Sequence, residues 1–213
     1  MQEKNFEANI RITSLSLLTE IESLTALCDS IIEIRRLIGF FGKVILEEVP
    51  NLKLLEKKTG GSLPDWVIGL SQGERVFVVK KSQWQNQKMD VSQLILHEFV
   101  HIALSQCVRK PLPVWLNEGL AVYLSGQYKD YKLEQSHIRA YVDFYTLSYQ
   151  SEHLYIIAAK ALVALVGAYG IDEVMKELFV CEEFETSRIF RNENLNHIVL
   201  EQEDDRMNQK GIE

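Results

Sequence analysis

The sequence predicts an α+β fold, in which a small mixed β-sheet in the N-terminal half is followed by a mostly helical C-terminal half. Short runs rich in β-branched residues, such as 43–49 and 75–79, lie before residue 90. From that point onward, apolar residues recur mainly at helical spacing. Because 46% of the 213 residues are hydrophobic, the chain can bury one sizeable core.

The same patterns predict one domain over residues 1–181, formed by an α/β part at 1–89 and a helical part at 90–181. Residues 182–213 are charged and only weakly periodic. We therefore expect a C-terminal extension that is partly mobile, with the mobility in its last roughly ten residues.

The elements of the N-terminal half follow from local patterns. Weak alternation predicts a strand at 6–12, and apolar residues at helical spacing predict one long helix from Leu18 to Ile38. Residues 43–49 form a β-branched run that Pro50 stops. The next expected elements are a brief helix ended by Gly60 and Gly61, and two strands around residues 71–73, the second at 75–79.

The charge and the cysteines of the chain exclude several classes of protein. A net charge of −7 argues against nucleic acid as a partner, because nucleic-acid binding needs a concentrated positive surface. The three cysteines, Cys28, Cys107 and Cys181, are widely spaced and form no CxxC pair. This spacing indicates neither a disulfide framework nor a cysteine zinc site, and reduced thiols fit the cytosol.

Neither export nor membrane insertion is indicated. Residues 1–14 mix charges and lack the continuous apolar region of a secretory signal. The longest apolar run, residues 154–169, is shorter than the roughly 20 residues that a bilayer requires, and Lys160 lies near its middle. We therefore expect a cytoplasmic protein in which this run is a buried helix.

Two histidines and a glutamate interrupt an otherwise apolar helix pattern that begins after Asp90. The run LILHEFVHIAL contains His97, Glu98 and His101. Because an α-helix has 3.6 residues per turn, the two histidines project from nearly the same line and can bind one metal ion. Glu98 lies beside them, where it can contact a metal-bound water without being a ligand. The pattern predicts a zinc site; in the alternative, the histidines bond to backbone carbonyls in the core and Glu98 faces solvent.

A second apolar helix pattern supplies a candidate third ligand. Pro113 suits the first turn of a helix and Gly126 suits its end. The segment between them is mostly apolar, apart from Asn117 and Glu118. If this helix packs against the first, Glu118 completes a set of two nitrogens and one carboxylate and leaves the fourth position open for water, as catalytic zinc requires. The alternative is a surface glutamate on an amphipathic helix.

The two motifs together resemble a known family. HEFVH followed by WLNEGLA closely resembles the gluzincin clan of zinc metallopeptidases, the group that contains thermolysin and the aminopeptidases. The WLNEG stretch is especially similar to the aminopeptidase version. The order of elements over roughly residues 6–180 is similar to that of small bacterial peptidase-MA-like members. The resemblance therefore implies a thermolysin-like catalytic domain.

The resemblance also implies a role for each matching residue. His97, His101 and Glu118 would be ligands of one zinc ion, and Glu98 would be the general base. Zinc lowers the pKa of its water toward about 7 and polarises the substrate carbonyl, while Glu98 takes the proton of the water and passes it to the leaving amine. The implied activity is hydrolysis of peptide bonds in a peptide or protein, in the manner of an endopeptidase.

Such chemistry usually needs a further donor to the oxyanion besides the metal. Tyr155 is similar in placement to a tyrosine of many gluzincins, although an aromatic residue packed in a core fits the sequence equally well. His137 matches no motif and is expected at the surface or as a cap. The competitors that the sequence does not rank against Tyr155 are Tyr123, Tyr145, Tyr149 and His153.

The segment RVFVV, residues 75–79, precedes the HExxH helix, where gluzincins resemble one another in having an edge strand that pairs with extended substrate. The resemblance implies that its backbone binds the substrate. An ordinary sheet strand is the alternative.

Two departures from the family limit the implied activity. No GAMEN stretch of the kind that holds a substrate amino terminus is present, so exopeptidase action is not supported. Val122 stands four residues beyond Glu118, where thermolysin-like enzymes tend to place an aspartate that orients a zinc histidine. Asn117 or a backbone carbonyl is the candidate substitute.

Two other classes of function stay open. One is a regulatory protein whose protease domain cuts a single dedicated partner. The other is a non-catalytic scaffold on a metallopeptidase-like fold, for which the helix over residues 18–38 and the charged tail are candidate contact surfaces.

Overall fold

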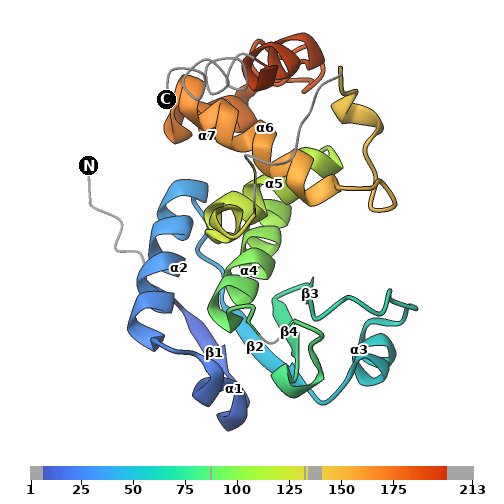
Figure 1. Cartoon of the computed structure of the whole chain (residues 1–213). Helices are drawn as coiled ribbons and strands as arrows, with labels where there is room; N and C mark the ends of the chain where they lie inside the picture. Colours follow the sequence, from blue (N-terminus) through green and yellow to red (C-terminus); the bar gives the residue numbers. More distant parts are fainter. Residues whose placement is uncertain (1–6, 87, 132, 134–140, 201–213) are drawn as a thin grey trace, which may run out of the picture. The chain divides into compact units, whose positions relative to one another are not determined.

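The computed structural model describes residues 7–86, 88–131, 133 and 141–200 (Figure 1). The chain divides into two compact units, residues 1–109 and 110–213, which we call unit 1 and unit 2. In its described part, unit 1 contains a four-stranded sheet with α-helices, and unit 2 is helical. The general α+β class predicted from the sequence is confirmed.

The sheet of unit 1 is mixed, with the strand order β1-β2-β4-β3. β1 (Ile10–Ile12) is parallel to β2 (Val44–Val49), β2 is parallel to β4 (Arg75–Val79), and β3 (Gly69–Gln72) runs antiparallel to β4. Residues 76–79 are all buried, as expected for a strand that is covered on both faces. Within the described residues, β1 and β3 are therefore the edges of the sheet.

The expectation that RVFVV is an edge strand is wrong. β4 pairs with β2 on one side, from Ile45 opposite Arg75 to Val49 opposite Val79, and with β3 on the other side. Its backbone hydrogen-bonding groups are thus used within the sheet and are not open to a substrate strand. The apolar run of β4 is typical of any buried strand, whereas strand order depends on pairing between segments far apart in the chain.

Two helices of unit 1 lie side by side, α2 (Leu24–Ile38) and α4 (Val91–Cys107), and α4 also packs on β3 and β4 (Figure 1). The shorter α3 (Leu52–Thr59) follows β2 and ends at the left-handed C-cap Gly60. The strands expected at 43–49 and 75–79 and this brief helix are therefore confirmed. A short 3₁₀ helix, η1 (Lys81–Gln83), follows β4.

The single long helix expected over residues 18–38 is instead two helices. α1 (Leu15–Glu20) ends at Ile21, whose backbone is extended, and α2 starts after the N-cap Ser23. The hydroxyl of Ser23 accepts a hydrogen bond from the backbone N–H of Ala26 at 3.2 Å. The prediction failed because the apolar period continues across the break, whereas the local bond of the serine favours a helix start at this point.

Unit 2 is organised around α5 (Val114–Leu124), which packs along α6 (Leu154–Tyr169). The ring of Trp115 is fully buried and lies 5.4 Å from the ring of Phe144, measured between centroids. This contact fixes the start of α5. The remaining helical segments are α7 (Ile171–Val180), the 3₁₀ helices η2 (Gln127–Lys129) and η3 (Phe144–Thr146), and residues 192–200.

The apolar run at 154–169 is a helix that packs into the core, as predicted: α6 buries eight of its 16 residues, among them Lys160, which is only 8% exposed. Among the described residues, no single helix is both long and apolar enough to cross a membrane. By length and composition, α6 and α7 are long and apolar enough only when the two helices are taken together, and their axes are bent by 105° at the break between them.

Residues 182–200, expected to begin a charged extension, contribute to the core of unit 2. The apolar residues of this segment are spread thinly among charged ones, so the periodicity of the sequence is weak although six of the apolar side chains are buried. Residues 201–213, where mobility was expected, lie outside the described residues. The buried apolar side chains are Phe184, Ile189, Phe190, Leu195, Ile198 and Val199.

Gly119 allows α5 to approach α6 closely. A Cβ atom at this position would lie 2.8 Å from the backbone carbonyl oxygen of Ala158. A backbone atom cannot rotate away as a side chain can, so the two helices would have to move apart. The glycine therefore sets the spacing of the helix pair that carries Glu118.

We expect Gly119→Ala to lower the melting temperature of the protein. Helix propensity alone would favour alanine by about 1 kcal/mol, whereas forcing extra atoms into a packed site costs about 1–3 kcal/mol. The control is Gly61→Ala, because a Cβ at Gly61 would meet nothing within 4 Å. Thermal unfolding followed by circular dichroism measures both variants, and an unchanged or raised melting temperature for Gly119→Ala would contradict the close approach.

Candidate metal centre

α4 places His97 and His101 one helical turn apart. The helix is capped by Asp90, whose carboxylate accepts a hydrogen bond from the N–H of Ser92 at 2.8 Å. The two imidazole Nε2 atoms lie 3.1 Å apart, and the ring planes are inclined by 81°. Two nitrogens bound to one tetrahedral zinc at about 2.0–2.1 Å are themselves about 3.3 Å apart. The pair therefore has the separation that one metal ion requires.

Glu98 lies on the same helix, directly after His97. Successive residues of an α-helix are rotated by roughly 100° about its axis, so Glu98 points to the neighbouring face. Its side chain is largely buried, with the residue 8% exposed. Among the described residues, none donates a hydrogen bond to its carboxylate. Glu98 is thus beside the histidine pair and has acceptor capacity to spare.

α5 buries Glu118 almost completely. The residue is 2% exposed, and its neighbours Leu116, Gly119 and Leu120 are buried as well. A buried ionised carboxylate is costly unless a cation or a set of donors compensates it. The alternative of a surface glutamate is therefore wrong, and a metal ion is one partner that would compensate the charge.

Together, His97, His101 and Glu118 form a buried group that could bind a metal ion. Each residue offers one ligand atom, and these atoms lie within 4.8 Å of one another. Two imidazole nitrogens and one carboxylate oxygen suit zinc and other divalent transition metals. The assignment to zinc and the catalytic role of Glu98 remain predictions.

Tyr155 is the second residue of α6 and is partly exposed. It lies three residues before Ala158, whose carbonyl approaches Gly119 of α5. Residues three apart share one side of a helix, so Tyr155 lies on the side of α6 that faces α5. Its role as an oxyanion donor remains a prediction.

The competitors of Tyr155 differ in their surroundings. The hydroxyl of Tyr145 donates a hydrogen bond to the carbonyl of Phe190 at 2.9 Å. The pKa of its phenol is raised mainly by burial, and to a smaller extent by the charges of Glu185 and Cys181. His153 has a left-handed backbone with φ of 61°, and its Nε2 atom lies 3.2 Å from a carboxylate oxygen of the exposed Glu152. The other two are Tyr149, which is 56% exposed, and Tyr123, which is stacked on Tyr128; His137 lies outside the described residues.

Tyr131 is a residue that the sequence did not single out. Burial is the larger cause that raises the pKa of its phenol, and the charge of Glu118 is the next. Tyr131 is therefore close enough to feel the candidate metal ligand. No motif includes it, because its position depends on how the chain turns after α5.

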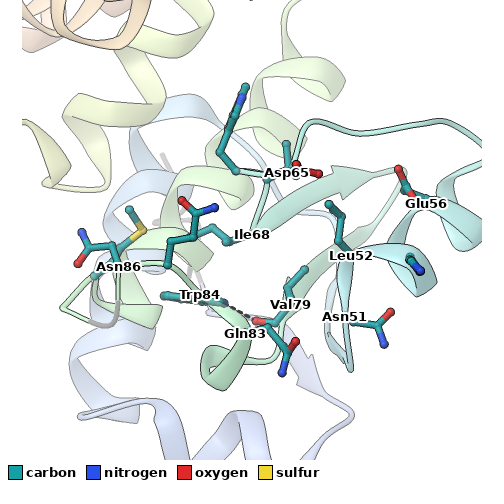
Figure 2. Close-up of a pocket in the computed structure, with 14 residues that line it drawn as sticks. Asn51, Leu52, Glu56, Asp65, Ile68, Val79, Gln83, Trp84 and Asn86 are labelled. Atoms are coloured by element: carbon teal, nitrogen blue, oxygen red, sulfur yellow. Dashed lines mark hydrogen bonds between the residues drawn. The ribbon is translucent and has the colours of Figure 1, made fainter.

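Unit 1 also contains a cavity of about 660 Å³ where β2 and β4 end. Figure 2 shows Asn51, Leu52 and Glu56 on one side of it and Asn86 on the other. Trp84 lies between them and donates its indole N–H to the carbonyl of Val79 at 2.6 Å. None of the candidate site residues lines this cavity, so we assign it no part in the metal centre.

No family model, curated protein or solved structure matches the chain. The likeness to gluzincins therefore rests on the two motifs, and the fold and the geometry above are described on their own terms.

Proposed function

We propose that the protein is a zinc-dependent peptidase of the gluzincin type, which cleaves internal peptide bonds. One observation carries the proposal: His97, His101 and Glu118 offer ligand atoms within 4.8 Å of one another that could bind a metal ion, and Glu98 is adjacent to His97 on α4. Structural zinc sites are usually closed by four protein ligands, whereas catalytic sites keep a position for water. A three-residue set beside a glutamate fits the second kind.

His97, His101 and Glu118 would hold the metal, which when bound would polarise a substrate carbonyl and make water a better nucleophile near neutral pH. The histidines must be neutral to bind, so the site is expected to load at neutral rather than acidic pH. Glu118 contributes a negative charge that offsets part of the charge of the cation.

Glu98 would act on protons rather than on the metal. Its carboxylate accepts the proton of the attacking water and returns it to the amine of the leaving peptide. Its position after His97 puts it at the same turn of α4 as the first ligand, and its burial limits competing bonds to solvent. These are the properties that a general base in this site needs.

β3 replaces β4 as the strand proposed to bind the substrate backbone. Within the described residues, β3 pairs on one side only, which leaves its other side open to an extended peptide. β3 also packs on α4. The approach is close at Gly69, where an added Cβ would lie 2.8 Å from a methyl carbon of Leu94. Leu94 is three residues before His97 on α4. An extended peptide on β3 would thus run close to the histidine pair.

The proposal is tested by incubating the zinc-loaded protein with a library of unstructured peptides and identifying the products by mass spectrometry. We expect cleavage at internal bonds, loss of cleavage after treatment with a chelator, and recovery after zinc is restored. In the same assay, Tyr155→Phe is expected to keep its metal and to lower kcat if Tyr155 is the oxyanion donor. Cleavage that survives metal removal would contradict the proposal.

Zinc binding without hydrolysis of any peptide in the library would favour the other classes instead. A dedicated partner would then be sought by offering folded proteins rather than peptides. Zinc bound with no turnover of either kind would support the non-catalytic scaffold.

A further inference from the structure

The cavity of unit 1 has an apolar floor. Its volume of about 660 Å³ lies within the roughly 300–1,000 Å³ of typical ligand pockets. Val79 and Trp84 are buried in its wall, and Leu52 and Ile68 are half-buried there (Figure 2). The indole N–H of Trp84 already donates a hydrogen bond to the carbonyl of Val79, so the indole ring adds an apolar surface to the cavity. The floor therefore suits an apolar group.

The exposed rim of the cavity carries four carboxamide side chains, those of Asn51, Gln83, Gln85 and Asn86. A carboxamide offers both N–H donors and a carbonyl acceptor. The carbonyl oxygens of Asn51 and Asn86 each accept a hydrogen bond from a nearby backbone N–H, which leaves their NH₂ groups as donors. Within the described part of the chain, the side-chain amides of Gln83 and Gln85 make no hydrogen bond. The rim can thus pair with both the N–H and the C=O groups of a ligand.

The charged groups at the cavity are of both signs. Lys53 brings a positive charge, and Glu56 and Asp65 bring negative charges. Glu56 also accepts a hydrogen bond from the backbone N–H of Leu63 at 2.9 Å, so part of its capacity is used within unit 1. A phosphate ligand would require a cluster of positive charge. A neutral ligand that combines amide groups with an apolar group fits this lining better, and an extended peptide has that composition.

The cavity adjoins β3. Val67 and Ile68 line the cavity, and Gly69, the next residue, begins β3. The carbonyl of Ile68 accepts a hydrogen bond from the N–H of Val79 at 2.8 Å, so the pairing with β4 continues to the edge of the cavity. A peptide lying along the side of β3 that pairs with no described strand would therefore reach the cavity where it leaves the strand.

The start of α4 gives the distance from the cavity to the histidine pair. Met89 lines the cavity and directly precedes Asp90, the N-cap of α4. His97 is seven residues beyond Asp90, which corresponds to about 10 Å along the helix axis at roughly 1.5 Å per residue. An extended peptide advances about 3.3 Å per residue. A peptide that joins the two places therefore spans this distance with about three residues or more.

We propose that the cavity binds one apolar side chain of an extended peptide, while the carboxamides of the rim pair with the peptide groups beside it. The inference rests on the proposed function for the role of this peptide as a substrate. It adds a preference for an apolar residue about three or more residues away from the cleaved bond.

Binding is tested by the tryptophan fluorescence of the full-length protein, kept free of metal so that no peptide is cleaved. Two of the three tryptophans, Trp66 and Trp84, line the cavity, whereas Trp115 is fully buried in unit 2. The probe is a pentapeptide of alanines with a central phenylalanine, blocked at both ends, and the comparison is the blocked all-alanine peptide. We expect a saturable change with the probe and an affinity about 10-fold lower for the comparison, because the buried phenylalanine side chain supplies apolar contact.

The rim is tested with Gln83→Glu and Gln85→Glu, which keep the size of the side chain but remove its N–H donors. Each variant is expected to bind the probe about 5-fold more weakly, the typical effect of one lost hydrogen bond. The matched control is Gln106→Glu, because Gln106 is an exposed glutamine near the end of α4 and does not line the cavity. Its affinity for the probe should equal that of the parent.

Unchanged fluorescence with both peptides, or equal affinities of the parent and both rim variants, would overturn the inference and leave the proposed function intact, because hydrolysis is assayed separately. Benzyl alcohol that binds as tightly as the probe would also overturn it, since the amide groups would then contribute nothing. In the hydrolysis assay, an apolar residue at the stated distance from the cleaved bond should lower KM and leave kcat unchanged. Probe binding by a protein that cleaves no peptide would support the peptide site and overturn its role in a substrate.

Discussion

Replacing Glu98 by glutamine is expected to abolish most of the hydrolysis while leaving the metal in place. The amide has nearly the shape of the carboxylate, but it cannot accept a proton from water. General acid–base catalysis contributes about 100-fold to 10,000-fold to a rate, so kcat should fall by that factor. The measurement is kcat on a peptide that the parent cleaves, together with zinc content by mass spectrometry.

The control for this variant is Glu33→Gln, which removes a carboxylate from an exposed position of α2. It should hydrolyse at the parent rate. Hydrolysis at the parent rate by Glu98→Gln would mean that another group removes the proton. Loss of zinc from Glu98→Gln would instead indicate that Glu98 belongs to the ligand set.

The second large effect is expected from the metal ligands themselves. His97→Ala removes one of three ligand atoms, and Glu118→Gln replaces an anionic carboxylate ligand by a neutral amide, so the zinc affinity should fall by more than the about 10–100-fold that an outer contact contributes. Zinc at about 100 times its dissociation constant stabilises a folded protein by about 2.7 kcal/mol. The melting temperature of the parent should therefore rise with zinc, and that of either variant should not rise at the same concentration.

Glu193→Gln serves as the control for this series, because Glu193 is an exposed carboxylate in unit 2. Its melting temperature should respond to zinc as that of the parent does. If Glu118→Gln retained the full response, the third ligand would have to be another residue. If His97→Ala retained it, the histidine pair of α4 would not be the site.

The sequence was sufficient for the parts of the site that lie within one helix. The spacing of His97 and His101 determines that both imidazoles leave α4 on one side, because the helical period is fixed by backbone geometry. The surrounding apolar residues determine that this helix is buried. The helix begins after Asp90, as expected, and Asp90 is its N-cap, because its carboxylate can accept a hydrogen bond from the first turn. For Glu118, an apolar helix pattern predicted burial, and the residue is buried.

The order of the strands and the close approach at Gly119 were decided by the tertiary structure. β4 is central and β3 is at the edge because of pairings between distant segments, which no local period encodes. Likewise, residues 182–200 look like a polar tail, although six of their apolar side chains are buried in unit 2.

The sequence by itself thus determined the chemistry of the candidate ligands and the local structure that presents them, since both depend on residue type and on spacing within one helix. The tertiary structure alone decided which strands form the edges of the sheet and how closely α5 meets α6. The physical reason is that these features depend on free energies of packing and pairing summed over segments far apart in the chain, to which any short stretch of sequence contributes only a part.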